Sequence, residues 1–488
     1  MALDQGTTST RACLITPDGR LAAQAGEDFE QIYPQPGWVE HNPEAIWSST
    51  VKSIGRVLEK AGVRGDQIEC IGITNQRETV AIWDSKTGRA FANAIVWQCR
   101  RTHEICEKLR KNKKQNLIRN KTGLIIDPYF SATKIQWLLK NVSGAAQKAK
   151  SGQLKTGTMD TFLLWKLTNG ESHATDVSNA SRTMLMNIHK GEWDRDLLKL
   201  FGIPLEILPQ IRSSSGLFGK TKGLGLLPDG IPITGMAGDQ QSALFGQAAF
   251  KVGEAKCTFG TGSFLLMNTG AKAVPSKSKL LTTIAWRLEK GSTVYALEGG
   301  AFICGAAVQW LRDGLGLFEK SSDIEALASS VPDAGGVQFV PALTGLGAPH
   351  WRAEARGVIT GLTRGSTKAH LARATLEAMA LQNAEILLAM QKDLKKKIPS
   401  IRVDGGAAAN NLLMQMQSDL LGAPVIRPVN VETTAMGAAY LAGLGAGIWK
   451  STEEIRKIWA QDREFRSHMK AKDRSERLER WLESVDKA

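Results

Sequence analysis

The chain has no apolar run of the roughly 18 residues that a membrane-spanning helix needs, and no basic, apolar and small-residue signal at its start. Its six cysteines form no CxxC pair, which argues against a disulfide framework and a typical zinc site. No segment is of low complexity. We therefore expect a cytoplasmic protein with reduced thiols that is neither secreted nor inserted in a membrane.

One short stretch does combine metal-binding residue types. Cys99, His103 and Cys106 could coordinate a metal ion, but a fourth ligand is missing. The surrounding residues have the pattern of an amphipathic helix. We expect a structural role for these three residues.

Positive charge is in excess. Lysine and arginine outnumber aspartate and glutamate by 62 to 48, which gives a net charge of +14. The densest basic run, Lys108–Lys121, is typical of a solvated helix face. Nucleic-acid binding is the alternative, but no aromatic residues interleave with this run as a single-strand platform requires. We expect no nucleic-acid partner, and the charge suits an enzyme that binds a nucleotide polyanion.

Two halves of the chain repeat one pattern. Each half opens with two strand-like runs joined by a turn of Gly and Thr, in Asp4–Thr16 and in Lys256–Asn268. Each half later has a strand that leads to Asp or Gly before a helix, at Ile231–Asp239 and Ile401–Gly406. Such repetition indicates a diverged internal duplication.

The length of 488 residues is too great for one hydrophobic core. Together with the duplication, it predicts an α/β fold of two domains with a cleft between them. We place the boundary near residue 248, between a domain of residues 1–247 and a domain of residues 248–488. The stretch after Lys450 has the composition of a charged surface helix.

The first turn has residue types that bind phosphate. Gly6 lets the backbone turn tightly, so successive N–H groups and hydroxyls can converge on phosphate oxygens. Arg11 adds a fork-shaped cation, and Asp4 can hold a hydrated Mg²⁺. An ordinary hairpin turn is the alternative. Because Gly260-Thr261-Gly262 repeats the arrangement in the second half, we favour a cleft that grips a phosphate chain from both walls.

Asp239 is the best candidate for the reacting centre. It lies between a strand and a helix, where the helix dipole favours an ionised carboxylate. An ionised Asp can accept the proton of an attacking hydroxyl, although a plain N-cap is the alternative. Arg77 and Glu78 follow another strand and could hold two neighbouring hydroxyls, or form a salt-bridged surface turn.

Two further groups of residues could line ligand pockets. Small residues in Asp404–Asn411 would let a purine approach the backbone, with Asn410 bonding its polar edge. Close helix packing with Asn410 as N-cap is the alternative. Trp97, Tyr129 and Phe264 each flank a polar motif, so each could wall a pocket for a small carbon skeleton or pack in the core.

These motifs, in this order from Leu3 to about Gly447, resemble the FGGY carbohydrate kinases, and most closely the members that phosphorylate glycerol. The resemblance is carried by segments such as GITNQRET, AIVWQCRRT, NASRTMLMNI, GMAGDQQSALFGQ, VDGGAAANN and ETTAMGAAYLAG. Tyr129–Asn141 and Gly357–Glu377 fit the two family signatures.

The resemblance implies an actin-like (ribonuclease H-like) ATPase fold, with two duplicated α/β domains and a nucleotide cleft between them. It also implies transfer of a phosphoryl group from ATP, with Mg²⁺, to glycerol, giving sn-glycerol 3-phosphate and ADP in glycerol catabolism. A homodimer or homotetramer is expected. Rival interpretations are a kinase for a pentulose or sugar acid, and an actin-like structural or chaperone ATPase.

Matching positions imply the site residues. The glycerol ligands would be Arg77, Glu78, Tyr129, Asp239 and Gln240, with Trp97 and Phe264 on either side of the carbon chain. The phosphate loop would be Thr7, Thr8, Ser9 and Arg11. The rest of the nucleotide site would be Thr261, Gly305, Gln309, Gly406 and Asn410. Asp239 is similar to the catalytic base of the family.

The chain departs from the family in two places. Only Met1-Ala2-Leu3 precede Asp4, where the family has a fuller first strand, so we expect a start upstream or a trimmed terminus. Arg352 follows Trp351, where the family usually has an acidic residue.

Overall fold

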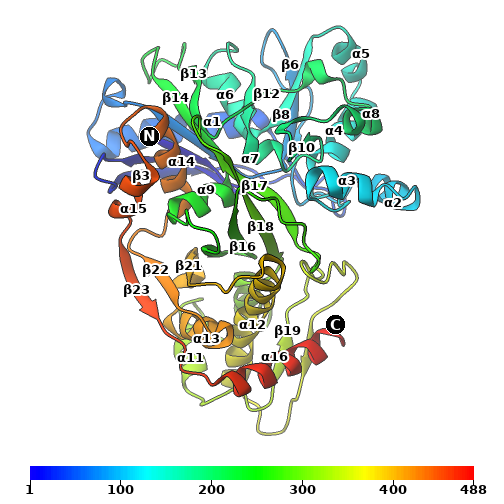
Figure 1. Cartoon of the computed structure of the whole chain (residues 1–488), viewed down its shortest axis with the longest axis vertical. Helices are drawn as coiled ribbons and strands as arrows, with labels where there is room; N and C mark the ends of the chain where they lie inside the picture. The colour runs from blue at the N-terminus through cyan, green and yellow to red at the C-terminus, as the bar shows by residue number, and fades with distance from the viewer.

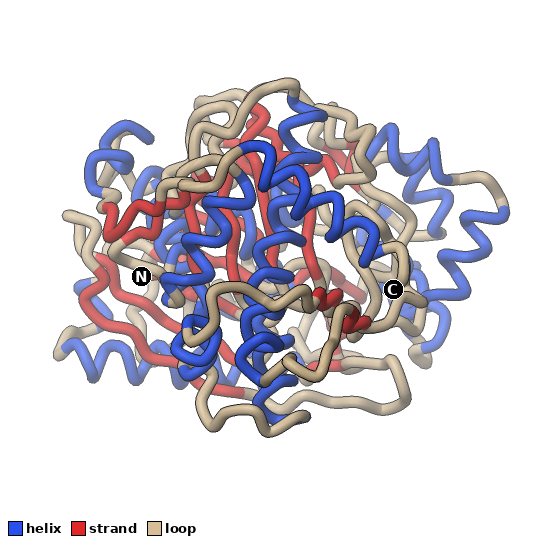
Figure 2. Tube along the Cα trace, turned by 90° about the horizontal axis from the view of Figure 1, so that it is seen from below, coloured by secondary structure: helices blue, strands red, loops and turns tan.

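The structure is a computed structural model that describes all 488 residues. Figure 1 shows two lobes, the upper one built mainly from the first half of the chain (blue to green) and the lower one from the second half. Figure 2 shows strands running through the middle of the molecule, with helices in front of them and on both sides. No helix combines the length and the apolar character that crossing a membrane requires.

The main sheet of the first half has six strands in the order β3-β2-β1-β5-β14-β13. They are β1 (Ala2–Gln5), β2 (Ser9–Ile15), β3 (Leu21–Asp28), β5 (Ile71–Asn75), β13 (Ser215–Lys220) and β14 (Pro232–Gly238). β1, β2 and β3 are antiparallel, whereas β5 and β14 run parallel to β1. β5 is buried along its whole length, as its apolar start predicts for a strand that is covered on both faces.

The main sheet of the second half has seven strands in the order β17-β18-β16-β15-β21-β22-β23. They are β15 (Ala255–Phe259), β16 (Ser263–Gly270), β17 (Leu281–Arg287), β18 (Thr293–Ala301), β21 (Ile401–Asp404), β22 (Val425–Pro428) and β23 (Gln461–Phe465). From β18 to β23 the order and directions repeat those of the first sheet: three antiparallel strands, two parallel ones and an antiparallel edge. The predicted duplication is confirmed.

Further elements of the first half lie beside its main sheet. Four strands form a second sheet: β4 (Glu40–His41), β7 (Ala94–Ile95), β6 (Val80–Asp84) and β8 (Leu154–Thr158). The helices are α1 (Pro43–Ala61), α2 (His103–Lys111), α3 (Gln115–Thr122), α4 (Ser131–Asn141), α5 (Ala145–Lys150), α6 (Met159–Leu167), α7 (Val177–Ala180), α8 (Arg195–Phe201) and α9 (Asp239–Gly246). Short strands β9 (Ala174–Asp176) and β12 (Gln210–Arg212) pair with each other, as do β10 (Met186–Asn187) and β11 (Glu192–Trp193).

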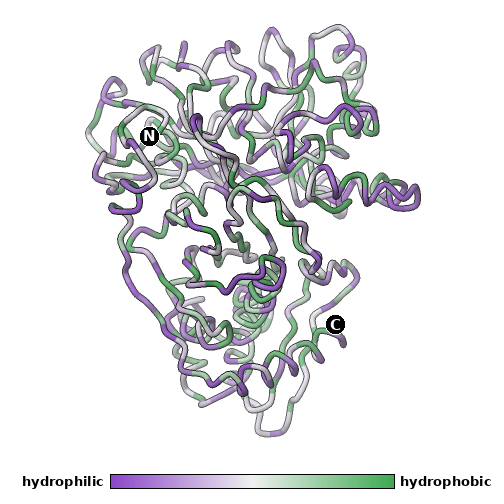
Figure 3. The backbone as a smooth tube through the Cα atoms, in the orientation of Figure 1, coloured by the Kyte–Doolittle hydropathy of each residue, from purple (hydrophilic) through white to green (hydrophobic).

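Local signals explain several of these elements. Asn42 caps α1 by accepting a hydrogen bond of 2.9 Å from the Glu44 N–H, and Pro43 is the first residue of the helix. The basic run lies on α2, α3 and the turn between them, which project from the upper lobe with hydrophilic residues at their outer end (Figure 3). The side chains of Cys99 and Cys106 are buried in an apolar core beneath these helices.

Five helices of the second half enclose one large apolar core against its sheet: α10 (Gly305–Gln309), α11 (Asp323–Ser329), α12 (Lys368–Leu394), α13 (Asn411–Leu421) and α16 (Ala471–Val485). Two more, α14 (Thr433–Gly445) and α15 (Thr452–Ile458), contribute to smaller cores, and β19 (Gln338–Val340) pairs with β20 (Val358–Thr360). Arg352 donates a hydrogen bond to the Val485 carbonyl at the end of α16, where a cation suits the helix dipole.

The two halves interlock through α9 and α14. Each helix follows the last parallel strand of its own sheet, yet α14 packs on the first sheet and α9 contacts the second. The backbones touch where they cross: a Cβ added at Gly437 would lie 1.8 Å from the Ser242 carbonyl oxygen, and one at Gly246 would lie 1.9 Å from that of Thr433. The crossing therefore has room only for glycine.

One local prediction needs correction. The stretch after Lys450 is not simply a charged surface helix, because the polar segment Gln461–Phe465 forms edge strand β23 beside β22. The helix predicted to follow Asp239 is short: it ends at Gly246, and Ala248 has a φ of +50°, which interrupts a helical backbone.

Gly437→Ala should lower the free energy of unfolding by about 1–3 kcal/mol, because the methyl group overpacks the helix crossing. Gly55→Ala in α1 is the matched control: no atom beyond its chain neighbours and the backbone of its own helix lies within 4 Å of the added Cβ, so helix propensity should raise stability by roughly 0.5–1 kcal/mol. Urea unfolding followed by circular dichroism measures both. Equal stabilities of the two variants would contradict the close crossing.

Candidate functional site

The parallel strands of the first sheet bring three loops to one edge. Gln5 is in register with Asn75 on β5, and Asn75 is in register with Gly238 on β14. The turn after β1, the polar segment after β5 and Asp239 after β14 therefore leave the sheet side by side. Ligands of open α/β sheets bind at this carboxyl edge.

The second sheet repeats this arrangement. Thr258 on β15 is in register with Asp404 on the parallel strand β21. Gly260-Thr261-Gly262 and Gly405-Gly406 therefore leave the sheet at the same edge. Gly405 has a φ of +85° and its added Cβ would lie 2.6 Å from the Phe259 carbonyl oxygen, so the turn needs glycine.

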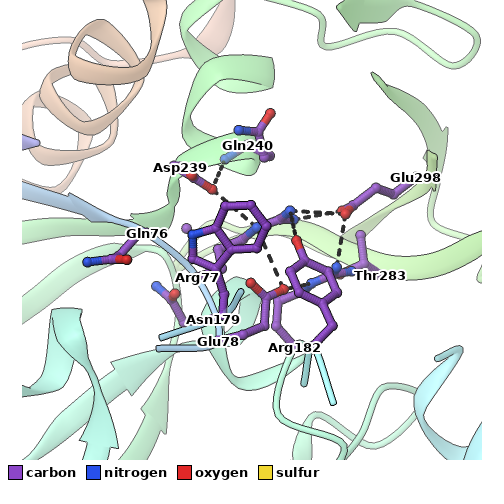
Figure 4. A network of polar contacts seen from close by, with 12 residues as sticks. Gln76, Arg77, Glu78, Asn179, Arg182, Asp239, Gln240, Thr283 and Glu298 are labelled. Atoms are coloured by element: carbon purple, nitrogen blue, oxygen red, sulfur yellow. Dashed lines mark hydrogen bonds and ion pairs between the residues drawn. The ribbon is translucent and has the colours of Figure 1, made fainter. Parts of the chain in front are cut away.

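Arg77 is the centre of a buried ion-pair network (Figure 4). Its Nε lies 3.1 Å from Asp239 Oδ1, and its two terminal nitrogens donate to Glu298 over 2.7 and 3.0 Å. Arg77 Nη2 also donates to the Tyr129 hydroxyl over 3.2 Å. This fork joins the segment after β5 of the first half to β18 of the second.

Arg182 completes the network. It donates to Glu78 Oε1 over 2.7 Å and to Glu298 Oε1 over 2.9 Å. Burial alone would raise the pKa of Glu298, but Arg182 and Arg77 outweigh it and hold the pKa below its usual value. Burial raises the pKa of Glu78, whose Oε2 has no hydrogen-bond partner within the chain. Glu78 thus keeps one oxygen for a ligand.

The backbone at Glu78 is strained. Its φ is +60°, and the Thr79 N–H donates to the Arg77 carbonyl over 2.7 Å, which closes a tight three-residue turn. Lys134 stabilises this turn by donating to the carbonyls of Glu78 (3.1 Å) and Tyr129 (2.6 Å). Burial lowers the pKa of Lys134 to about 7.

Aromatic rings stand beside these polar groups. The Trp97 ring contacts those of Tyr129 and Phe264 edge-on, with centroids 5.7 and 6.3 Å apart. Trp97 Nε1 donates to Thr7 Oγ1 over 3.0 Å, so an aromatic wall and the first turn touch. Phe264 comes from the second half, which means that both halves build this wall.

Asp239 is the first residue of α9 and not its N-cap, which is Gly238. Its Oδ1 lies near Arg77 and accepts the Gln240 N–H over 2.7 Å, whereas Oδ2 has no hydrogen-bond partner in the chain. The side chain is 31% exposed, so a ligand can reach it. Gln240 Oε1 accepts a hydrogen bond from Lys256, a buried lysine that also donates to Thr258 over 2.7 Å.

A cavity of about 580 Å³ lies in the second half. It contains all five residues expected there for the nucleotide: Thr261, Gly305, Gln309, Gly406 and Asn410. Asn410 Oδ1 accepts the Leu413 N–H over 2.8 Å, so it also caps α13, the alternative that the sequence left open. Leu376 and Met379 of α12 add apolar wall that the sequence motifs did not indicate.

A second cavity of about 790 Å³ adjoins the first and shares Gly406 and Ala409 with it. It is lined from both halves, including Asp4, Arg11 and Thr258. Thr7, Thr8 and Ser9 do not line it: Thr7 bonds Trp97, and Ser9 closes the turn by accepting the Gly6 N–H over 2.9 Å.

The carboxylates around this cavity are not fully neutralised by positive charge. Arg11 is paired with Glu432 over 2.8 Å. Burial raises the pKa of Asp4 to about 7, against the opposing effect of Arg11, and the carboxylates of Asp239 and Glu432 raise it further. A cation bound here would therefore relieve repulsion among carboxylates.

Sequence comparison identifies related proteins. The model of the FGGY family of carbohydrate kinases, N-terminal domain, matches residues 1–246, and that of the C-terminal domain matches residues 255–446. The glycerol kinase of Bdellovibrio bacteriovorus is 67% identical over 487 residues, which cover 100% of this chain and 98% of that protein.

Solved structures agree with this. Plasmodium falciparum glycerol kinase with ADP is similar with a TM-score of 0.92 and 38% identity, over 99% of this chain and 97% of that chain. A ligand-bound xylulose kinase from Lactobacillus acidophilus has a TM-score of 0.86 and 22% identity, over 100% of this chain and 96% of that one. The second similarity shows a shared fold alone.

Glu298→Gln should lower the free energy of unfolding by about 3–5 kcal/mol, because it leaves Arg77 and Arg182 buried without their shared counter-charge. Glu171→Gln is the control, since its pair with Lys222 is exposed and the unfolding midpoint should not move. Denaturant titration of both variants tests this. A Glu298→Gln midpoint equal to that of the wild type would show that the network contributes nothing to stability.

Proposed function

Because the chain belongs to the FGGY family of carbohydrate kinases, we propose that it transfers the γ-phosphoryl group of ATP to a terminal hydroxyl of glycerol, giving sn-glycerol 3-phosphate and ADP. The observation that carries this proposal is the juxtaposition at one edge of the cleft. Asp239, with a free Oδ2, lies beside Arg77 of the ion-pair network and close enough to raise the pKa of Asp4, which lines the larger cavity together with Arg11.

The acceptor would lie against the ion-pair network. Arg77 and the free oxygen of Glu78 address two neighbouring hydroxyls, and Tyr129 supplies a third polar contact. Gln240, whose side chain is held by Lys256, follows Asp239 in the first turn of α9. Trp97 and Phe264 cover the carbon chain, so water is excluded where the hydroxyl attacks.

Asp239 would act as the general base. Arg77 holds Oδ1 in place, which leaves Oδ2 to accept the proton of the attacking hydroxyl. Phosphoryl transfer passes through a loose transition state, so positioning and charge stabilisation matter more than early deprotonation. Arg11 supplies positive charge to the transferring phosphate.

The nucleotide would occupy the two adjoining cavities. Its base enters the one that contains Gln309 and Asn410, and its phosphates extend over Gly406 towards Thr261 and Arg11. Thr7, Thr8 and Ser9 line neither cavity, so they would contact the phosphate chain only when the halves close further on the substrates.

Mg²⁺ is the expected companion of ATP, and the residues fit it. Asp4 offers a carboxylate whose pKa burial raises to about 7. Arg11 opposes this rise, whereas Asp239 and Glu432 add to it. A nearby dication would therefore favour the ionised form of Asp4. A hydrated Mg²⁺ needs few protein ligands. When bound, the ion neutralises charge on the phosphates. We assign Asp4 to it, through water.

Three further expectations remain proposals: a cytoplasmic location, a homodimer or homotetramer, and a division of labour at residue 248. In that division residues 1–247 supply the catalytic Asp, the phosphate loop and most of the acceptor pocket. Residues 248–488 supply most of the nucleotide site, together with Phe264 and Glu298. Light scattering after size exclusion measures the oligomer.

Glycerol should be phosphorylated faster than xylulose or gluconate at matched concentration, because Trp97 leaves a pocket for a short carbon chain. Removing one hydroxyl from the acceptor should also lower kcat/KM, since it leaves a buried polar group unpaired. A coupled ADP-release assay over a panel of polyols and ketoses measures this. Faster turnover with a pentulose would favour the rival kinase assignment, and ADP release without any acceptor would favour an ATPase switch.

Asp239→Asn should lower kcat by a factor of roughly 10²–10⁴, with the lower half of the range expected for a loose transition state. The amide keeps the shape of the side chain, so the KM for glycerol should change little. A Mg²⁺ titration separates the roles: rescue at high Mg²⁺ indicates a metal ligand, and no rescue indicates a base. A variant with more than about a tenth of wild-type kcat would refute the base assignment.

A further inference from the structure

His41 lies outside the residues assigned so far, yet it touches both sides of the site. The ring is fully buried and contacts Phe29 edge-on, with centroids 5.0 Å apart. Its Nε2 is 2.8 Å from Gln31 Oε1, and its Nδ1 is 3.1 Å from Gln76 Nε2. Gln31 bonds the backbone of the first turn at Thr7, and Gln76 precedes Arg77. Figure 4 shows Gln76 pointing away from the ion-pair network.

The direction of each hydrogen bond follows from the partners. Gln31 Nε2 donates to the carbonyls of Thr7 (3.1 Å) and Phe29 (3.2 Å), so its oxygen must face the ring. His41 Nε2 therefore carries the proton, and Nδ1 accepts from the Gln76 amide. Burial lowers the pKa of His41 to about 4, so the ring is neutral at pH 7, as this pattern requires.

Further hydrogen bonds connect Gln76 back to Thr7 and so close a ring. Gln76 Oε1 accepts from the Thr79 hydroxyl over 3.1 Å, and Thr79 Oγ1 accepts the Trp97 N–H over 3.2 Å. Trp97 Nε1 then donates to Thr7 Oγ1 over 3.0 Å. Thr7 is thus held twice, through Gln31 at its carbonyl and through Trp97 at its hydroxyl.

We propose that His41 is a positioning residue that holds the first turn in register with the acceptor pocket. The closed ring, made by Thr7, Gln31, His41, Gln76, Thr79 and Trp97, contains one residue of the expected phosphate loop and one wall of the pocket. Each neighbouring pair in the ring is joined by a hydrogen bond, so displacing any member breaks at least one of these bonds. His41 joins Gln31 to Gln76 from a fully buried position.

The proposal rests on the proposed kinase activity, in which a phosphate and a hydroxyl must meet. A misplacement of about 1 Å can lower a reaction rate by roughly 10²-fold. Because the adenine cavity lies in the other half of the chain, the ring should affect turnover while leaving ADP binding alone.

His41→Phe should lower kcat by about 10- to 100-fold at a temperature well below its melting point, with an ADP Kd within about twofold of the wild type. His173→Phe is the matched control: His173 also contacts aromatic rings, bonds one carbonyl, and has a pKa lowered to about 4 by burial, but it is outside the ring. It should keep the wild-type kcat. Equal kcat losses in the two variants would overturn the proposal.

Partial replacements sharpen the test. Asn at position 41 can place an acceptor near Nδ1, and Gln can place a donor near Nε2, so each restores one of the two bonds. His41→Asn and His41→Gln should therefore be faster than His41→Phe and slower than the wild type. If both are as slow as His41→Phe, the bonds do not position anything.

Gln31→Met keeps the test decisive if His41→Phe does not fold. Gln31 is half-buried, and its loss opens the same ring, whereas Gln24→Met in β3 is a half-buried control outside it. Gln31→Met should lose kcat and Gln24→Met should not. In the double variant Gln31→Met with His41→Gln, the two losses of kcat should combine to less than their product. Losses that multiply in full would refute the ring.

A wild-type protein that is inactive on glycerol would refute the proposed function instead. The same variants are then compared on the acceptor that the wild type does use.

Discussion

The contact on which the rest of the structure depends is the crossing of α9 and α14. Each helix starts at the carboxyl edge of one main sheet and packs against the other half, and the backbones meet where Gly246 and Gly437 leave no room for a Cβ. That crossing sets the two sheets with their carboxyl edges facing each other. Asp239 begins one of these helices, and Thr433, which donates to Asp404 over 2.6 Å, begins the other.

The buried charges are the second constraint, and they follow from the first. Removing a guanidinium or carboxylate from water is strongly unfavourable unless partners are close and well oriented. Arg77 and Glu298 come from different halves and reach each other only because the helix crossing fixes their sheets. The network then leaves single oxygens free on Glu78 and Asp239, so the groups that suit substrate hydroxyls are oriented before a substrate arrives.

Local signals in the sequence predict turns and helix starts. They do not reveal strands or ion pairs that form between segments far apart in the chain. Asn42 with Pro43, and Gly260-Thr261-Gly262, mark a helix start and a turn whatever the rest of the chain does. β23 is polar and forms a strand only because β22 offers it an open edge. Glu298 is a lone charge in a buried strand, a signal that could have pointed to it, but its partner Arg77 lies 221 residues earlier in the chain.

The hydrogen bond between Trp97 and Thr7 affects how the site discriminates between acceptors of different size. Trp97 is at once a wall of the proposed acceptor pocket and a support of the first turn. A longer acceptor in that pocket would have to displace this ring, and the displacement would break the bond that holds Thr7. Size would then be sensed where the phosphate is positioned, in addition to where the acceptor binds. With such coupling, a wrong substrate is discriminated against mainly by a lower kcat. The reacting groups are misaligned in its transition state, while its binding in the ground state is largely unchanged.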